Sequence, residues 1–215
     1  MSFVSFQKRE ITFKLVYYGP PLSGKTTNLE LLHKVIPATE RGDMTMLSTR
    51  QDRTLYFDFL PLQSNAIKGF VSKFQLYTVP GQPIYTETRR IVLNGVDGVV
   101  FVADSQWSEM EANTDSFENL KENLATDDVS LEDLPHILQF NKRDLPEIAP
   151  IHYLEFMLNR GEHRVPSFES VATEGTGIRE SLNAMAKLVM ARFIKEHKME
   201  IGEVINREDL AVSDA

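Results

Sequence analysis

The sequence contains no cysteine, and this absence excludes several kinds of chemistry. A chain without thiols forms no disulfide, offers no thiolate to a metal ion and has no acceptor for prenyl or palmitoyl groups. Position two is Ser2 rather than glycine, and the N-terminus lacks the basic-then-apolar layout of a signal peptide. No apolar run approaches the length of a membrane span. We therefore expect a soluble, cytoplasmic protein without a lipid anchor.

Positive charge is also scarce. Lys and Arg total 23 against 31 Asp and Glu, which gives a formal net charge of -8 and a pI near 5.2. Bulk electrostatics of this sign do not recruit nucleic acid, so we expect no nucleic-acid partner. The five His residues show no metal-ligand spacing. With 215 residues, 42% of them hydrophobic, the chain can bury one sizeable core, which predicts one domain.

What the sequence does contain is an alternation of strand-like and helical stretches. The polar turn Gln63-Ser64-Asn65 favours a hairpin, which makes one strand antiparallel. This order predicts an α/β fold with a six-stranded, mostly parallel sheet, one antiparallel edge strand and helices on both faces. The expected strands are residues 11–18, 54–62, 69–79, 96–103, 136–140 and 168–172, and the expected helices are residues 25–36, 109–125, 151–158 and 178–195.

The first of these strands runs into a phosphate-loop pattern. Gly19-Pro20-Pro21-Leu22-Ser23-Gly24-Lys25-Thr26 matches G-x-x-x-x-G-K-[ST] between a strand and a helix. Backbone N–H groups at the helix start can wrap a β-phosphate, Lys25 adds positive charge, and the hydroxyl of Thr26 can bind Mg²⁺. The alternative is an ordinary glycine-containing turn. The candidate nucleotide-binding residues here are Gly19, Ser23, Gly24, Lys25, Thr26 and Thr27.

A second motif, Asn141-Lys142-Arg143-Asp144, follows an expected strand directly, at the end where ligands bind in open α/β sheets. The carboxylate of Asp144 can accept two hydrogen bonds from guanine, whereas adenine has no matching pair of donors. Asn141 can tie this loop to the phosphate loop, and the stem of Lys142 can lie on the base. The backbone N–H of Ala172 is placed for the guanine carbonyl. The alternative is a solvated loop that caps the next helix.

With these two motifs in this order, the chain resembles the Ras-like small GTPases, and more closely the bacterial MglA family of polarity and gliding-motility GTPases. The resemblance covers residues 2–195. It also rests on Tyr-Tyr-Gly-Pro at 17–20, Arg-Thr-Leu-Tyr-Phe-Asp-Phe at 53–59, Thr-Val-Pro-Gly-Gln at 78–82 and Val-Asp-Gly-Val-Val-Phe-Val-Ala-Asp-Ser at 96–105. We expect a GTPase domain at residues 1–195, and a charged helix extension or loose tail at residues 196–215.

The second switch departs from the usual Ras-like pattern, Asp-x-x-Gly-Gln. Thr78 stands in place of the acid, so Mg²⁺ has one acidic partner fewer. Asp58 is a candidate substitute, and it equally fits an outward-facing strand residue. Gly81 has no Cβ and can bring its N–H close to the γ-phosphate. Gln82 is the candidate that orients the attacking water, with an exposed loop amide as the alternative, and Pro83 favours extended backbone at Gln82.

The resemblance further implies that Thr54, together with Thr26, supplies a hydroxyl to Mg²⁺. It implies that Arg53 is a built-in arginine finger, and with Gln82 a catalytic residue; a solvated surface arginine is the alternative. Its implied ligands are GTP or GDP and Mg²⁺. Its implied partners are a Roadblock-type, homodimeric MglB-like GTPase-activating protein and polarity or motility effectors, with recruitment to a cell pole.

The function implied is a molecular switch that hydrolyses GTP slowly alone and faster with a partner. Two other interpretations compete with it. A P-loop kinase or ATPase is opposed by the motif that ends in Asp144. A nucleotide-locked pseudo-GTPase scaffold is favoured by Thr78 and opposed by the presence of both Arg53 and Gln82.

Overall fold

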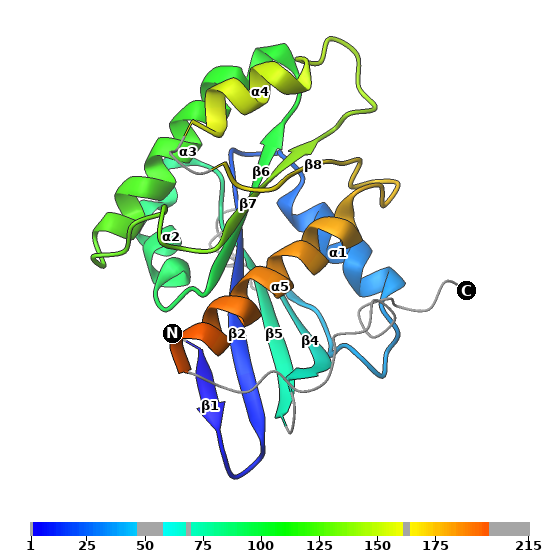
Figure 1. Cartoon of the computed structure of the whole chain (residues 1–215). Coiled ribbons are helices and arrows are strands. Elements are labelled where there is room, and N and C mark those ends of the chain that lie inside the picture. Colours follow the sequence, from blue (N-terminus) through cyan, green and yellow to red (C-terminus); the bar gives the residue numbers. More distant parts are fainter. Residues whose placement is uncertain (1, 47–57, 68–69, 161–163, 198–215) are drawn as a thin grey trace.

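A mixed β-sheet forms the centre of the protein, with helices on both sides (Figure 1). The structure is a computed structural model that describes residues 2–46, 58–67, 70–160 and 164–197. Its strands are β1 (Phe3–Ser5), β2 (Glu10–Tyr18), β3 (Thr45–Met46), β4 (Asp58–Ile67), β5 (Phe70–Thr78), β6 (Gly98–Asp104), β7 (His136–Asn141) and β8 (Ser167–Glu169). Its α-helices are α1 (Lys25–Val35), α2 (Thr86–Leu93), α3 (Met110–Ala125), α4 (Ile151–Leu158) and α5 (Ile178–His197), with short 3-10 turns η1 (Pro83–Tyr85) and η2 (Trp107–Glu109).

The strand order within the described residues is β3-β4-β5-β2-β6-β7-β8, with β1 paired to β2. The pairs β2–β5, β2–β6, β6–β7 and β7–β8 are parallel, whereas β4–β5, β3–β4 and β1–β2 are antiparallel. Because β5 occupies one edge of β2 along nearly its whole length, β1 and β6 share the other edge. The fold is thus the expected α/β arrangement, and the loops after the parallel strands meet at one edge of the sheet.

All six expected strands are present, and the hairpin of β4 and β5 is confirmed. The turn predicted at Gln63-Ser64-Asn65 is wrong, because β4 continues to Ile67 and β5 begins at Phe70. The outer edge of β4 is paired with β3 only at its first two residues, so polar residues are tolerated farther along this strand. The short strands β1 and β3 and the helix α2 were not predicted: each strand is too short to show a clear periodicity, and α2 has a buried Arg89 and an exposed Ile91, the reverse of an amphipathic pattern.

Two hydrophobic layers enclose the sheet. Phe13, Leu15 and Tyr17 of β2 pack in the layer that contains α1 and α5, while Val16 and Tyr18 pack in the layer of α2, α3 and α4. This alternation is the period of two that a strand imposes on its side chains. In α1, Leu29 and Leu32 are fully buried, whereas Val35 is 40% exposed and Ile36, just past the helix end, is buried in the core. A fully buried side chain of this size contributes about 1.5–3 kcal/mol.

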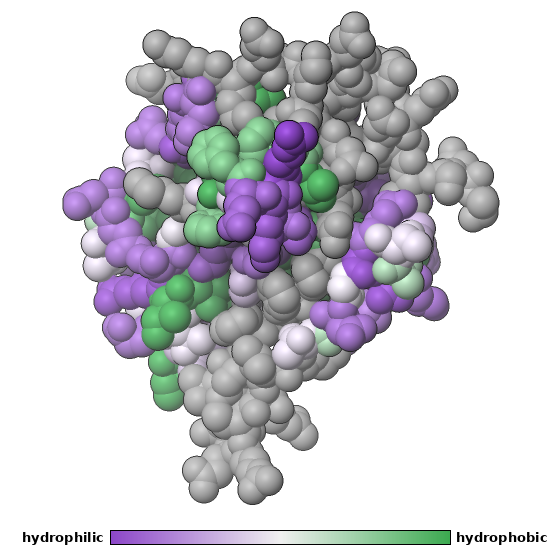
Figure 2. Space-filling model, turned by 90° about the horizontal axis from the view of Figure 1, so that it is seen from below, coloured by the Kyte–Doolittle hydropathy of each residue, from purple (hydrophilic) through white to green (hydrophobic). Residues whose placement is uncertain are grey.

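Figure 2 views the end of the molecule at which the β1–β2 hairpin lies, opposite to the loops that follow β2, β6 and β7. On its coloured part, apolar patches are small and are bordered by hydrophilic residues. Phe3 and Phe6 are 71% and 77% exposed, and Phe6 packs edge-on against Phe70. In the described part of the chain, none of the helices has both the length and the apolar composition of a membrane span.

Candidate nucleotide site

The loops after β2 and β6 open at the point where the chain switches from one face of the sheet to the other. The helix after β2, α1, packs in one hydrophobic layer, and the helix after β6, α3, packs in the other. Adjacent parallel strands whose helices diverge in this way leave a crevice at their carboxyl ends. The predicted phosphate loop and the predicted base loop, which follows β7, both lie at this edge.

Two glycines shape the phosphate loop. Gly19 has φ 144°, and a Cβ on it would lie 2.2 Å from the carbonyl oxygen of Val102. Gly24 has φ 103°, and a Cβ on it would lie 2.2 Å from Nδ2 of Asn141. A side chain at either position is therefore excluded both by the backbone conformation and by a close neighbour. Leu22 also has positive φ, at 60°, which is uncommon outside glycine and marks a loop held in a strained shape.

The loop presents the groups that a phosphate requires. Lys25 is buried, and its Nζ donates to the carbonyl oxygens of Gly19 at 2.9 Å and Pro20 at 2.6 Å. The buried hydroxyl of Ser23 has no hydrogen-bond partner among the described residues. Helix α1 begins at Lys25 with no acid in its first turn, so its positive end is not neutralised locally. Thr26 is exposed beside it, with Thr27 partly exposed.

Asn141, the last residue of β7, connects the base loop to the phosphate loop. Its Nδ2 donates to the carbonyl oxygen of Ser23 at 2.8 Å. Its Oδ1 accepts from the hydroxyl of Ser170 at 3.1 Å and from the backbone N–H of Ala172 at 3.0 Å. Asn141 is 2% exposed, so these bonds form in a poorly solvated environment. Three loops that are far apart in the sequence are thereby fixed to one side chain.

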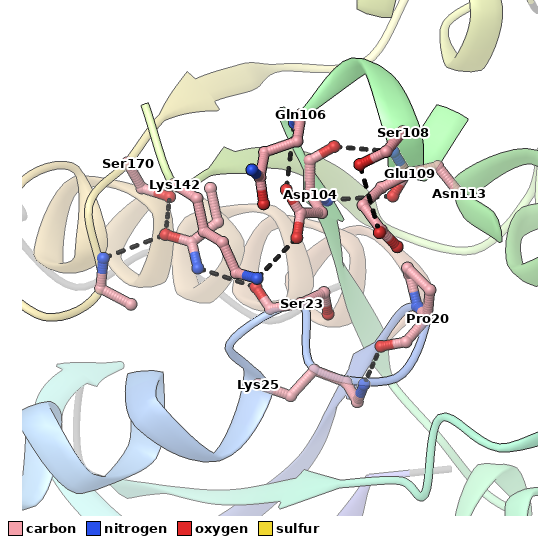
Figure 3. Close-up of polar contacts among 12 residues, drawn as sticks. Pro20, Ser23, Lys25, Asp104, Gln106, Ser108, Glu109, Asn113, Lys142 and Ser170 are labelled. Carbon is pink, nitrogen blue, oxygen red and sulfur yellow. Dashed lines mark hydrogen bonds and ion pairs between the residues drawn. The ribbon is translucent and has the colours of Figure 1, made fainter. Parts of the chain in front are cut away.

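An ion pair orients Lys142. Its Nζ lies 2.6 Å from Oδ2 of Asp104, the last residue of β6, and Figure 3 shows the two side chains pointing toward each other above Ser23. Asp104 is almost fully buried, and its Oδ1 also accepts from the backbone N–H of Gln106 at 3.0 Å. Asn113 of α3 bonds both backbone groups of Asp104, at 2.9 and 2.8 Å. The carboxylate that holds Lys142 is therefore itself fixed by α3.

The other base-loop residues have different surroundings. Asp144 is exposed, and no hydrogen bond or ion pair to another described residue holds its carboxylate. Arg143 donates to the carbonyl oxygen of Ala149 at 2.7 Å and pairs with Glu169 at 3.1 Å, which connects the loop to β8. The N–H of Ala172 already donates to Asn141, so a guanine carbonyl would have to share this donor.

The second switch lies against the phosphate loop. A Cβ on Gly81 would lie 2.3 Å from the backbone nitrogen of Pro21, so the chain approaches the loop as closely as glycine permits. Gln82 is exposed, and its φ of -69° and ψ of 137° confirm the extended backbone expected before Pro83. Thr78 ends β5 in register with Tyr17 and is buried.

The structure describes little or nothing of three residues for which roles were predicted. Arg53 and Thr54 lie outside the described residues. Asp58 begins β4, opposite Met46, and its side chain is not among those described. The roles predicted for these residues stay predictions.

Sequence reasoning missed two charged residues that the fold brings to these loops. Asp104 follows the apolar residues of β6, and an acid placed directly after a buried strand was the available signal. Arg89 lies in α2, 4% exposed, and its guanidinium donates to the carbonyl oxygen of Gln82 at 3.2 Å. No sequence pattern singled out Arg89, because the helix that carries it was not predicted.

The chain is similar to a known protein along most of its length. The protein named Mutual gliding-motility protein MglA, from Myxococcus xanthus strain DK1622, is 49% identical to this chain over 196 residues. The match covers 91% of this chain and 99% of that protein. No protein-family model matches the chain.

Proposed function

Because this chain belongs to the MglA family of small GTPases, we propose that it is a GTP-binding molecular switch that hydrolyses GTP to GDP and phosphate. The observation that carries the proposal is the bond between Asn141 and the carbonyl oxygen of Ser23. It fixes the loop with phosphate-binding chemistry to the loop with guanine-reading chemistry. A ligand that carries both a guanine base and phosphates can therefore contact both loops at once.

The residues present fit this ligand. The N–H groups from Ser23 to Thr26, the unpaired hydroxyl of Ser23 and the charge of Lys25 suit a β-phosphate. Asp144 is exposed, and therefore open to the two guanine donors. The hydroxyls of Thr26 and Thr54 would hold Mg²⁺, which would neutralise charge on the β- and γ-phosphates when bound.

Hydrolysis is assigned to Gln82 and Arg53. Gln82 orients the attacking water, and its exposed, extended position beside the phosphate loop supports that role. Arg53 stabilises negative charge in the transition state as a built-in arginine finger. A Roadblock-type, MglB-like homodimer accelerates the reaction by pressing both residues into place.

The cellular role follows from the relative, which is named for mutual gliding motility. We assign this chain to the control of motility or polarity through effectors that bind its GTP state, at a cell pole. We further propose that the GTPase domain spans residues 1–195 and that residues 196–215 are a charged extension or tail.

One observation favours a second candidate, a pseudo-GTPase scaffold that holds GTP without turnover. Thr78, in place of the usual acid, is buried at the end of β5. Beside it in register, the hydroxyl of Tyr17 is buried without a hydrogen-bond partner among the described residues, and burial raises the pKa of Tyr17. Neither Thr78 nor Tyr17 is an acid, so neither supplies the carboxylate that usually supports the metal shell.

Single-turnover hydrolysis of GTP by the purified chain with Mg²⁺, alone and with a Roadblock-type partner, tests the proposal. We expect slow turnover that the partner accelerates, and loss of the acceleration in Arg53→Ala and in Gln82→Ala while nucleotide stays bound. In such enzymes, an arginine finger alone raises the rate of GTP hydrolysis by about 1,000- to 100,000-fold. Competition between ATP and GTP for binding distinguishes this proposal from the kinase or ATPase alternative, which predicts that ATP displaces GTP. GTP binding without turnover under any of these conditions would establish the scaffold instead.

A further inference from the structure

A buried arginine lies beneath the second switch. Arg89, in the first turns of α2, is 4% exposed. Helical side chains of this length point back toward the helix N-terminus, and here that direction leads to the segment that precedes α2. The guanidinium NH1 donates to the carbonyl oxygens of Gln82 at 3.2 Å and Gly81 at 3.4 Å, and NH2 donates to Oγ1 of Thr86 at 3.1 Å.

Two of these contacts reach the carbonyl oxygens of consecutive residues, Gly81 and Gln82. NH1 bonds the two neighbouring carbonyls while NH2 of the same planar group bonds Thr86, so the segment is fixed relative to the start of α2 in orientation as well as in position. The carbonyl of Gln82 also accepts from the backbone N–H of Tyr85 at 3.2 Å, which closes η1. The segment from Gly81 to Tyr85 is thus joined to α2 through its carbonyl oxygens.

The opposite side of the same segment lies against the phosphate loop. A Cβ on Gly81 would lie 2.3 Å from the nitrogen and 2.5 Å from Cα of Pro21. Gly81 therefore has the phosphate loop on one side and Arg89 on the other. Because both neighbours contact the backbone, the direction of the Gln82 side chain depends on them and not on contacts of its own.

Arg89 also acts on the strand that leads into the phosphate loop. Burial raises the pKa of Tyr18 to about 12, and the positive charge of Arg89 works against this shift, so the guanidinium lies within electrostatic range of the Tyr18 hydroxyl. That hydroxyl is held by Asn119 at 2.7 Å and Asn123 at 2.9 Å, both on α3. A buried charge is strongly unfavourable unless hydrogen bonds compensate it, and NH1 and NH2 of Arg89 make such bonds to the Gly81 and Gln82 carbonyls and to Thr86.

We propose that Arg89 is a positioning residue for GTP hydrolysis, which holds the Gly81–Gln82 backbone against the phosphate loop so that Gln82 faces the γ-phosphate. The inference rests on the proposed function, because Arg89 affects hydrolysis only by placing Gln82. Arg89 touches no nucleotide atom in this assignment. Lysine does not replace it, because the planar guanidinium holds the two carbonyls through NH1 and Thr86 through NH2, whereas an ammonium has one nitrogen and lacks this pair of donor atoms.

The test uses the full-length chain in four forms: the parent, Arg89→Lys, Gln82→Ala and the double variant. We expect Arg89→Lys to slow single-turnover hydrolysis with Mg²⁺ by about 10- to 100-fold, the effect of a misplaced catalytic group. Affinity for GDP, followed by fluorescence of the single tryptophan, should change less than about threefold. In the Gln82→Ala background, Arg89→Lys should add no further loss. An equal loss in both backgrounds, or a matching loss of GDP affinity, would overturn the assignment.

Amide hydrogen exchange supplies a readout that does not depend on turnover. Arg89→Lys should raise exchange at Tyr85, whose N–H bonds to the Gln82 carbonyl, and leave the N–H of Ala172 protected. The matched control is Arg90→Lys on the same helix, whose guanidinium contacts Asn123 and Glu87 and which should change neither rate nor exchange. Unchanged exchange at Tyr85 in Arg89→Lys overturns the positioning role. If the parent shows no hydrolysis while Tyr85 exchange rises as expected, the hydrolytic function fails and the role of Arg89 in holding the segment stands.

Discussion

The base loop and the second switch flank the same phosphate loop and are held in different ways. Asn141 bonds the Ser23 carbonyl at 2.8 Å, the Ser170 hydroxyl at 3.1 Å and the Ala172 N–H at 3.0 Å, and Lys142 pairs with Asp104 at 2.6 Å. The contacts from Arg89 to the carbonyls of the second switch are longer, at 3.2 and 3.4 Å. Hydrogen bonds weaken toward the upper end of this range.

The difference matches what each loop would do under the proposed function. A loop that identifies the base performs the same task in every nucleotide state, so it gains from side chains fixed in one arrangement. A loop that responds to the γ-phosphate must change, and segments that move belong to the less stable part of a protein. Gln82 is exposed, whereas Asn141 is 2% exposed. Under the proposed function, the loop that would recognise the base is therefore held more tightly than the loop that would respond to the γ-phosphate.

The largest effect is expected from Asn141→Ala, which removes the bonds that join the three loops. The Ser23 carbonyl, the Ser170 hydroxyl and the Ala172 N–H lose their partner, at about 1–3 kcal/mol for each buried group left unpaired. We expect GDP affinity to fall by at least about 100-fold, since each 1.4 kcal/mol is tenfold. Titration calorimetry measures the affinity, and urea unfolding the stability.

The control for this variant is Asn159→Ala. Asn159 is also buried and bonds both backbone groups of Val165, away from the nucleotide loops. It should lower the free energy of unfolding and leave GDP affinity unchanged. If Asn141→Ala and Asn159→Ala reduce affinity equally, the base loop is no more tightly coupled to binding than the rest of the fold.

A smaller effect is expected from Asp104→Asn. The amide can keep the bond from the Gln106 N–H and loses the charge that holds Lys142. A hydrogen bond to a charged group is worth about 1.5–3 kcal/mol, so we expect roughly tenfold weaker GDP binding and an unchanged rate of hydrolysis once GTP is bound. The dissociation rate of labelled GDP measures this.

Glu169→Gln is the matched surface control for this ion pair. Glu169 pairs with Arg143 of the same loop, but its side chain is 60% exposed, and exposed pairs contribute about 0–1 kcal/mol. Its GDP dissociation rate should stay close to that of the parent. Equal acceleration in both variants would show that burial of Asp104 is irrelevant to how Lys142 is held.

The positions of the phosphate loop and the base loop, after β2 and β7, were predictable because the motifs that mark them are local. The phosphate loop and the motif from Asn141 to Asp144 each combine a glycine or polar string with a neighbouring strand. Asp104 was not predictable as the partner of Lys142, because that pairing depends on β6 lying beside β7 in register. The spatial order of strands is set by packing and not by any string of residues.

The second switch was predictable only in part. Pro83 fixes the extended backbone of Gln82, which is a local effect and is found in the structure. The helix that follows has eight residues, among them the exposed Ile91 and the buried Arg89, so its pattern is the reverse of an amphipathic helix at these two positions. Tertiary contacts with the Gly81 and Gln82 carbonyls explain the buried charge, and no sequence pattern contains them.

The smallest effect concerns β7, the strand that carries the rigid loop at its far end. His136 begins this strand, and burial lowers the pKa of its imidazole, while the Leu134 carbonyl, 2.9 Å from Nδ1, opposes the shift. The unfolded chain therefore binds a proton at His136 more readily than the folded protein does, so its contribution to stability is present above the unfolded pKa of about 6.5 and is lost as pH falls toward the folded value. We expect the urea midpoint to decrease from pH 7 to pH 5, and His136→Gln to decrease less. His152→Gln, an exposed histidine on α4, is the control and should follow the parent. A parent-like slope in His136→Gln would show that protonation elsewhere governs the acid response.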